Sequence, residues 1–515
     1  MSFDSNKSER YLASTRINNL TIVFLLSAPF IVVFYASFVL NPKHADHLVL
    51  YVLQVLADVI SITVLAGLWV TVLLDVVVEW HHRLKRLWDK EWLSATQPTL
   101  DCIVTAFNEP LPVIEKTLKA VLALEYPHTT YVFDDGPSEE LRLLAQELGV
   151  KYFTRIPIEG RKHNKSGNLN RGLEQCTGDF FAIFDADQVP APNFITTLLP
   201  YMVNPKVAMV QSPQHYVNTN QFIAAGAAQA QEVFYRYVCP SKNISNSAFC
   251  VGTNMIFRRR AIDGIGGIAF NKSEDIWTSL KLHESGWQTI FVNKVLAFGQ
   301  APATVISYFK QQLRWARGGL EMLFYHNPLR SSKLELDQRI QYFMSNSFFL
   351  VGISIFVYLI FPLLYLLFNI KPLQTESPFT WLVHYVPFFL LYYSLTYLLT
   401  GRLHLSTLST ALATFYPYLL ALLSVFFDKE HEWTATTSQK SSVDYFLKWT
   451  WPHFFIVFLT PMALIVGWYN RVDFWSGIFY SVWAIVNMLL LILFLTGEKR
   501  RGIAQENAHP STTLV

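Results

Sequence analysis

Long apolar stretches on both sides of a polar middle region constrain the fold of this chain more than any other feature. A helix needs about 20 apolar residues to cross a bilayer. Asn18–Leu40 and Leu48–Val78 reach that length before the polar region. Further apolar stretches follow it: Met344–Phe368, Trp381–Leu399, Leu405–Phe427, His453–Trp468 and Phe474–Leu495. Only 15% of the residues are charged, against about 25% in soluble domains. The sequence therefore predicts a multi-pass membrane protein.

The distribution of cations predicts how these stretches are oriented. The basic segment 81–86 follows the second stretch, and such a flank is normally cytosolic. No cleavage site follows a short apolar region, so the first stretch predicts an uncleaved anchor. If 405–427 lies flat at the interface, Lys429, Lys440 and the C-terminal cations 499–501 all stay inside. We therefore predict six spans, two before the polar region and four after it.

The polar region, residues 95–330, alternates short apolar runs with helical patterns. "LDCIVTAFN", "TYVFDDG" and "DFFAIFDAD" are typical of buried strands, and "VIEKTLKAVLALEY" and "EELRLLAQELGV" of helices. This order predicts a mainly parallel α/β sheet covered on both faces. The four widely spaced cysteines indicate neither a zinc site nor a disulfide framework. A net charge of +3 indicates no broad nucleic-acid surface.

Acidic residues follow two of the predicted strands. Asp134-Asp135-Gly136 follows "TYVF", and Asp185-Ala186-Asp187 follows "DFFAIF". Ligands of α/β sheets gather at the carboxyl ends of the strands. Two acids one residue apart form a hard oxygen site for Mg²⁺ or Mn²⁺, which can hold a diphosphate. The alternative is a solvated acidic turn, and a second acidic strand end in one domain favours the metal site.

Two further segments carry candidate chemistry. The segment 163–168, "HNKSGN", predicts a loop before a helix that contacts anionic oxygen, or an ordinary basic turn. Glu274-Asp275 begins a predicted helix with Ser273 as its N-cap, which satisfies the helix dipole. The same carboxylates are also candidates for a general base that deprotonates an acceptor hydroxyl. On that helix, His283 is expected to pack rather than to bind a ligand.

Five motifs occur in order along the chain: "FDDG", "HNKSGN", "FDADQVP", "SEDIWTSL" and "QQLRW". With this order and spacing the chain resembles the processive membrane glycosyltransferases of family 2, and most closely bacterial cellulose synthase catalytic subunits. The resemblance implies a cytosolic α/β glycosyltransferase domain of GT-A-like, nucleotide-diphospho-sugar transferase fold, inserted into a membrane α-helical bundle. It also implies Mg²⁺ or Mn²⁺ as cofactor, a UDP-sugar donor and a growing polysaccharide acceptor.

The resemblance assigns roles to individual residues. It implies nucleotide-sugar binding by residues at strand ends and in "QQLRW": Phe107, Glu109, Asp134, Asp135, Lys165, Asp185, Gln311, Gln312 and Arg314. It implies metal binding by Asp185 and Asp187, and catalysis by Asp275 as the base with Glu274 beside it. Trp315 would then stack on the terminal acceptor sugar, since an indole face suits a pyranose ring.

Two departures from the family are visible. The gating loop of the family is matched by Trp433 and Thr436, but Lys440 comes two residues later than the family's lysine. About twenty residues follow the last apolar stretch, so no C-terminal cyclic-di-GMP domain is expected. The predicted organisation is, in order: 1–17 cytosolic, 18–80 two spans, 95–330 glycosyltransferase domain, 331–427 interfacial helices and two spans, 428–450 cytosolic gating-type loop, 451–497 two spans, and 498–515 a short cytosolic tail.

The predicted function is a processive, inverting β-glycosyltransferase that polymerises a UDP-sugar, with UDP-glucose favoured, into a β-glucan such as cellulose and translocates it. The expected location is the bacterial inner membrane with the catalytic domain in the cytosol, where the lipid bilayer and not nucleic acid is the partner. Whether an accessory export subunit is a further partner is left open by the sequence. Alternatives are a curdlan-like or mixed-linkage glucan, chitin or hyaluronan as product. A polyprenyl-phosphate sugar transferase would not need "QQLRW", and a transporter or receptor would not need the acids.

Overall fold

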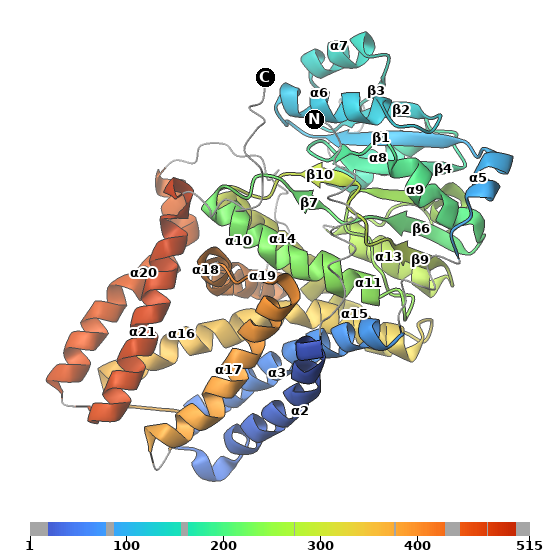
Figure 1. Ribbon diagram of the computed structural model, residues 1–515. Helices are drawn as coiled ribbons and strands as arrows, with labels where there is room; N and C mark the ends of the chain where they lie inside the picture. The colour runs from blue at the N-terminus through green and yellow to red at the C-terminus, as the bar shows by residue number, and fades with distance from the viewer. Residues whose placement is uncertain are drawn as a thin grey trace.

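The computed structural model describes residues 19–78, 87–155, 163–271, 273–374, 377–427, 443–470 and 472–500. An α/β domain lies on one side of a bundle of long apolar helices, and two helices, α10 (Phe222–Val233) and α14 (Val305–Tyr325), run between the two parts (Figure 1). The chain enters this domain after two bundle helices and leaves it before the others. The predicted fold class, an α/β domain inserted into a membrane helical bundle, is confirmed.

The main sheet has seven strands in the order β3-β2-β1-β4-β8-β6-β9. Their bounds are β1 Leu100–Ala106, β2 Thr129–Asp134, β3 Lys151–Phe153, β4 Phe180–Asp185, β6 Val207–Gln211, β8 Met255–Arg258 and β9 Gln288–Phe291. β8 is antiparallel to both of its neighbours, while the other pairs are parallel. A second sheet, β5-β10-β7, consists of Val189–Pro190, Ala297–Gly299 and His215–Tyr216. The prediction of a mainly parallel sheet is thus confirmed.

Both faces of the main sheet are covered, because alternate side chains of a strand point to opposite faces. Cys102 and Val104 of β1 belong to one apolar core, whereas Ile103 belongs to another. The first core is covered by α6 (Leu111–Leu122), α7 (Glu139–Glu147) and α9 (Phe194–Leu198). The second is covered by α8 (Asn164–Leu173), α12 (Arg259–Gly264) and α13 (Glu274–Glu284).

Seven segments are long and apolar enough to cross a membrane, judged by length and composition within the described residues. The helices that make up six of them are α2 Asn19–Val39, α3 Leu48–Val78, α16 Val351–Phe368 with α15 Leu336–Ser347 before it, α17 Pro378–Thr400, α20 Val443–Tyr469 and α21 Phe474–Leu495. They contain the six spans expected from the sequence. The chain is a multi-pass membrane protein.

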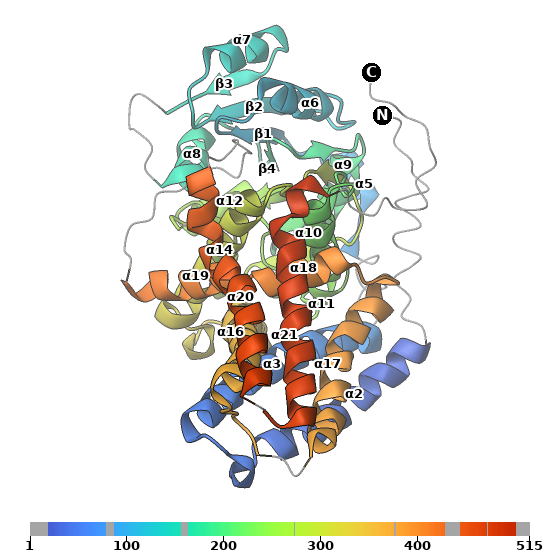
Figure 2. The ribbon, with the colours of Figure 1, turned by 90° about the vertical axis from the view of Figure 1, so that its left-hand side faces the viewer.

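The seventh segment, 405–427, consists of two helices. α18 (Leu405–Ala413) and α19 (Phe415–Phe427) meet at Thr414. α18 packs on α10, and α19 packs along α14, so both lie against the helices that border the α/β domain. Figure 2 shows α19 running across the direction of α20 and α21. This arrangement is the one expected of an interfacial helix, although the segment is apolar enough to span. The six-span topology therefore stays a prediction.

Candidate active site

The register of three adjacent strands brings the predicted donor residues to one edge of the sheet. Ala106 at the end of β1 pairs with Asp134 at the end of β2. On the other side, Thr105 pairs with Asp185 at the end of β4. Because these strands are parallel, their carboxyl ends meet at the same edge. Phe107, directly after β1, therefore lies between the two acidic strand ends.

The Asp134 carboxylate is buried and already engaged by its own turn. It accepts hydrogen bonds from the backbone N–H groups of Gly136 and Ser138, both at 2.9 Å, and from the Tyr152 hydroxyl, also at 2.9 Å. Burial raises the pKa of Asp134, and these three donors oppose that rise. The carboxylate thus fixes the turn into α7, beside Phe107. Its predicted contact with the nucleotide stays a prediction.

Asp135 forms a buried ion pair that the sequence reasoning missed. The Arg155 guanidinium lies 3.0 Å from Asp135 Oδ1, and both side chains are almost fully buried. Arg155 also donates to the backbone carbonyl of Asn164 at 2.9 Å. The pair therefore ties the end of β2 to the start of α8. The only signal in the sequence was a cation two residues after the short run "KYF".

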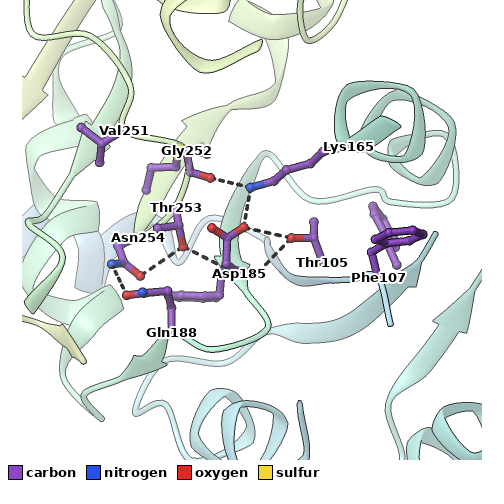
Figure 3. Close-up of polar contacts among 12 residues, drawn as sticks. Thr105, Phe107, Lys165, Asp185, Gln188, Val251, Gly252, Thr253 and Asn254 are labelled. Carbon is purple, nitrogen blue, oxygen red and sulfur yellow. Dashed lines mark hydrogen bonds and ion pairs between the residues drawn. The ribbon is translucent and has the colours of Figure 1, made fainter. Parts of the chain in front are cut away.

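Lys165 reaches Asp185 from the first turn of α8. Its ammonium forms an ion pair with Asp185 Oδ1 and donates to the carbonyl of Gly252 at 2.8 Å (Figure 3). Burial lowers the pKa of Lys165, but the charges of Asp185 and Glu274 outweigh burial, and the pKa is raised. The prediction that 163–168 forms a loop is wrong, because α8 begins at Asn164. The left-handed backbone of His163 and Asn164 provides the turn instead.

Asp185 ends β4 and Asp187 follows it by two residues, so the two predicted metal ligands stand at the same strand end. The Thr105 hydroxyl donates to Asp185 Oδ1 at 3.2 Å, and the Asp185 N–H donates to Thr253 Oγ1 at 2.9 Å. Burial and the charge of Asp185 raise the pKa of Asp187 to about 6. Within the described residues, no group of three acids, histidines or cysteines could hold a metal ion. Two carboxylates suffice where diphosphate oxygens and water complete the shell, as is usual for Mg²⁺.

The segment 250–254 supports these groups and was missed from the sequence. Gly252 has φ +88°, a conformation that favours glycine, and its carbonyl accepts from Lys165. Asn254, fully buried with φ +59°, donates from Nδ2 to Gln188 Oε1 at 3.0 Å (Figure 3). The Gly and Asn of "VGTN" signalled a turn. The antiparallel pairing of β8 with β4, which brings this turn to the site, was not visible in the sequence.

Glu274 and Asp275 open α13 on the other side of Lys165. They line a small cavity together with Lys165, Gly252 and Cys250. Burial raises the pKa of both carboxyls, while the charges of Lys165 and Arg314 oppose the rise. A carboxylate with a raised pKa is better suited to take a proton from a hydroxyl. The arrangement therefore suits the predicted base.

Ser273 precedes this pair at the N-cap position, but its side chain makes no capping hydrogen bond. Its hydroxyl instead lies 3.5 Å from the carbonyl of Arg314 on α14. The prediction of a side-chain cap is therefore wrong, because α14 approaches the start of α13 closely. His283, further along α13, is buried between Tyr342 and Thr289, at 2.7 and 2.8 Å. It packs as predicted.

Glu109 is a further acid close to the end of β1. Its carboxylate accepts a hydrogen bond from the backbone N–H of Phe107. Burial, with smaller contributions from the charges of Asp185 and Asp187, raises the pKa of Glu109 to about 7. Glu109 thus lies within electrostatic reach of the candidate metal ligands.

The segment "QQLRW" lies in α14 at the border of the membrane bundle. Gln312 is buried and accepts a 2.7 Å hydrogen bond from the Tyr418 hydroxyl of α19. Gln311, Arg314 and Trp315 are half-buried. The charge of Arg314 acts on Glu274 and Asp275, so the structure brings Arg314 to the candidate base. The other substrate contacts of α14 stay predictions. Trp433, Thr436 and Lys440 of the gating loop lie outside the described residues.

The four cysteines, Cys102, Cys176, Cys239 and Cys250, are all buried and unbridged. This agrees with the sequence prediction of no disulfide framework.

Comparisons with known proteins agree with this geometry. The family model described as "Glycosyltransferase like family 2" matches residues 98–318, and the one described as "Cellulose synthase" matches residues 263–503. The cellulose synthase catalytic subunit (UDP-forming) of Pseudomonas fluorescens is 32% identical over 304 residues, which are 56% of this chain and 40% of that protein. The cellulose synthase 1 catalytic subunit (UDP-forming) of Komagataeibacter xylinus is 26% identical over 439 residues, 80% of this chain and 58% of that protein. The chain thus spans less than two thirds of the length of these relatives.

Among solved structures, a mannosyltransferase from Pyrobaculum calidifontis in complex with GDP-Man and Mn²⁺ aligns with a TM-score of 0.48 and 16% identity, over 72% of this chain and 100% of that one. Glucosyl-3-phosphoglycerate synthase from Mycobacterium tuberculosis, solved with Mn²⁺ and UDP, aligns with a TM-score of 0.30 over 41% of this chain and 76% of that one.

The described residues form an α/β domain with acids at two strand ends, inserted between apolar helices. The chain is similar to the family 2 glycosyltransferases over residues 98–318, to the cellulose synthases over residues 263–503, and to bacterial cellulose synthase catalytic subunits. The resemblance predicted from the five motifs is confirmed.

Proposed function

We propose that this protein is a processive, inverting β-glycosyltransferase that polymerises UDP-glucose into a β-glucan of the cellulose type and translocates it across the membrane. The observation that carries the proposal is the convergence of two cations on the same carboxylates. Lys165 pairs with Asp185 at its strand end and acts on the Glu274-Asp275 pair, and Arg314 on the membrane-border helix α14 acts on that pair as well. A donor site, a base and a helix leading to the bundle thus meet in one place.

The donor binds at the sheet edge in this proposal. Phe107, Asp134 and Asp135 lie at the β1 and β2 ends, where the nucleotide base is expected. Asp185 and Asp187 would hold a divalent cation, Mg²⁺ or Mn²⁺, which would supply positive charge for the diphosphate of the donor. Lys165 stands beside Asp185 and adds a positive charge for the same anion. The bilayer, the UDP-sugar and the growing polymer are then the partners of the enzyme.

The transfer step follows from the positions of the carboxylates. Asp275 accepts the proton of the acceptor hydroxyl as the oxygen attacks the anomeric carbon of the donor sugar. The new glycosidic C–O bond forms while the bond to the diphosphate breaks, and UDP leaves with the bonding electrons. Attack opposite to the leaving group inverts the anomeric configuration, which gives a β-linkage from an α-linked donor. Trp315, on the same helix as Arg314, holds the acceptor ring.

The orientation of the protein follows from the proposed chemistry. UDP-sugars are cytosolic, so the α/β domain faces the cytosol and α20 and α21 carry the product outward from it. We propose the bacterial inner membrane as the location, in agreement with the bacterial source of the relatives.

Purified protein incubated with each UDP-sugar and Mg²⁺ or Mn²⁺ tests the proposal. The expected product is an insoluble polymer from UDP-glucose alone, degraded by a β-1,4-glucan hydrolase and lost on chelation of the metal. A product cut only by β-1,3-glucanase, chitinase or hyaluronidase would replace cellulose by that polymer. A single sugar transferred to a polyprenyl phosphate, with no polymer, would overturn the processive mechanism.

A further inference from the structure

The backbone of α14 lies against the side chain of Ser273, at the start of α13, where Gly318 stands. A Cβ added at Gly318 would lie 1.8 Å from Ser273 Oγ and 2.3 Å from Ser273 Cβ. Such distances do not occur between real atoms. Rotating the Ser273 hydroxyl away would not relieve the contact, because the β-carbon itself lies too close. Only a residue without a side chain fits at 318.

This contact lies between the two parts of the proposed mechanism. Gly318 follows Arg314 by one helical turn, and Trp315 lies between them. Ser273 directly precedes Glu274 and Asp275. The Ser273 hydroxyl also lies 3.5 Å from the Arg314 carbonyl. The contact therefore sets how far the acceptor helix stands from the carboxylates.

A second link holds the same segment to α14. The Asn271 side chain accepts from the Ser273 N–H at 3.0 Å and donates to Glu321 at 3.5 Å. Glu321 in turn pairs with Arg317 at 3.0 Å, where Arg317 is almost fully buried. Asn271 and Glu321 thus keep the backbone at Ser273 in place from the side. Two separate contacts, Gly318 with Ser273 and Asn271 with Glu321, therefore hold α14 against the start of α13.

We propose that Gly318 and Ser273 form a positioning site, through which α14 sets the distance between the acceptor sugar and the base Asp275. The inference rests on the proposed function and deepens it. Neither residue touches a substrate. They act through Asp275, and a misplacement of about 1 Å at a reacting group can cost about 100-fold in rate.

The test is a suppressor pair. Gly318→Ala is expected to lower kcat for polymer synthesis by about 10- to 100-fold. UDP affinity, measured by calorimetry with Mn²⁺, is expected to change less than about 3-fold, because the donor site is built at the strand ends. Ser273→Gly in the same chain removes Oγ and Cβ and leaves Cα at 3.5 Å, an ordinary contact. The double variant is therefore expected to recover the kcat of Ser273→Gly alone.

Gly264→Ala is the matched control, because a Cβ there meets no atom within 4 Å, and its activity is expected to be unchanged. If Gly318→Ala does not fold, Ser273→Thr adds a methyl group to the same contact and is expected to lower kcat in the same way. Full activity of a folded Gly318→Ala protein would overturn the proposal. So would failure of Ser273→Gly to restore kcat, or an equal loss of UDP affinity.

The melting temperatures of wild type, both single variants and the double variant measure the same contact without any activity. Two residues in contact give non-additive effects, whereas independent residues give additive ones. Additive melting shifts would overturn the contact even if polymer synthesis is as proposed. Non-additive shifts in a protein that makes no polymer would instead retain the contact and reject the proposed function.

Discussion

Asp275 stands closest to the proposed chemistry at the residue scale, since it has a raised pKa, lines one cavity with Lys165 and feels the charge of Arg314. We expect Asp275→Asn to lower polymer synthesis by about 10²–10⁴, because an amide cannot take the acceptor's proton. UDP binding should persist, since the nucleotide site consists of other residues. Incorporation of radiolabelled glucose and calorimetry with UDP measure the two quantities. Turnover above half of the wild-type value would show that Asp275 is not the base.

Glu109 predicts a pH dependence of stability. Burial raises its pKa from 4.5 to about 7 in the folded protein. A carboxyl with a raised folded pKa stabilises the protein most below its unfolded pKa, and this contribution is lost as the pH rises through the folded pKa. The wild type should therefore lose stability relative to Glu109→Gln between about pH 4.5 and about pH 7. Melting curves of both proteins across this range provide the measurement, and a constant difference would contradict the predicted shift.

The acids at the strand ends were predictable from the sequence, whereas their partners were not. An apolar run that ends in "FDD" or "FDAD" marks the carboxyl end of a strand directly. The partners Arg155, Thr253 and Asn254 come from segments whose positions depend on tertiary pairing. Asn254 reaches the site because its N–H donates to the Ile183 carbonyl of β4, and no local pattern encodes that pairing.

At the element scale, α14 is one of the two helices, with α10, that run between the α/β domain and the bundle (Figure 1). Its first turn is fixed by a capping box between Thr304 and Ser307. The Val305 N–H also donates to Glu498, which follows α21, at 2.7 Å. Along its length α14 packs on α19. A helix that is held in both the α/β domain and the bundle is better suited to position the acceptor sugar than a helix that moves freely.

Trp315 on α14 is expected to determine elongation. Trp315→Ala should stop polymer growth and leave slow hydrolysis of the UDP-sugar, because water can still reach the donor. Trp315→Phe should retain partial synthesis, since a smaller ring still stacks. Released UDP and polymer length report the two reactions separately. The control is Trp475→Ala, which changes an exposed tryptophan at the start of α21. Full-length polymer from the Trp315→Ala protein would show that Trp315 serves only as a membrane anchor.

A second prediction at this scale concerns Asp58 in α3, a fully buried carboxylate in a predicted span. It accepts hydrogen bonds from Tyr35 of α2, Gln54 of α3 and Tyr358 of α16, at 2.5, 2.8 and 2.6 Å. The carboxylate thus ties the N-terminal helix pair to the first span after the α/β domain. Intramembrane acids are rare and usually paired.

Asp58→Ala should lower the melting temperature clearly, because three buried donors lose their acceptor at about 1–3 kcal/mol for each unpaired group. Asp58→Asn keeps an acceptor oxygen and should lose less. Asp46→Ala, in the exposed loop between α2 and α3, is the control. Thermal melting in detergent measures all three variants. Equal melting temperatures of the Asp58→Ala and Asp46→Ala proteins would contradict the proposed role of Asp58 in tying these helices together.

Element boundaries followed the sequence where apolar periodicity was strong and departed from it where polar contacts decided. α3 and α21 have the bounds predicted for their spans. The predicted stretch 344–368 is divided, because α15 ends at Ser347 and α16 begins at Val351. The start of α8 depends on left-handed residues at 163 and 164. Histidine and asparagine tolerate this conformation, but nothing in the local sequence requires it.

At the scale of the whole molecule, the α/β domain meets the bundle through a layer of four helices, α10, α14, α18 and α19. In this layer Gln229 of α10 donates to the Arg402 carbonyl at 2.7 Å, and its Oε1 accepts from the His404 N–H at 3.0 Å. Glu232 of α10 pairs with Arg402 at 2.7 Å. These contacts tie the α/β domain to the junction of α17 and α18. The position of α18–α19 in the membrane is therefore coupled to the position of the catalytic domain.

The number of spans is the last prediction, and it follows from this layer. If 405–427 lies flat, both of its ends face the cytosol, on the side of the α/β domain. If it spans, its ends lie on opposite sides. The contacts of α18 with α10 and of α19 with α14 favour the flat arrangement, because both partners border the α/β domain. A helix pair that crossed the bilayer would leave these partners after its first turns.

Introduced cysteines distinguish the two arrangements. The natural cysteines are buried, so a membrane-impermeant thiol reagent reports mainly on new ones. We expect Leu405→Cys and Phe427→Cys, at two exposed positions, to react in inside-out vesicles and not in intact cells. Glu140→Cys in the catalytic domain marks the cytosolic side, and Asp46→Cys in the exposed loop between α2 and α3 marks the other side in both arrangements. Reaction of Leu405→Cys and Phe427→Cys from opposite sides would establish a seventh span. It would also place the end of α21 and its cations outside, against the positive-inside rule.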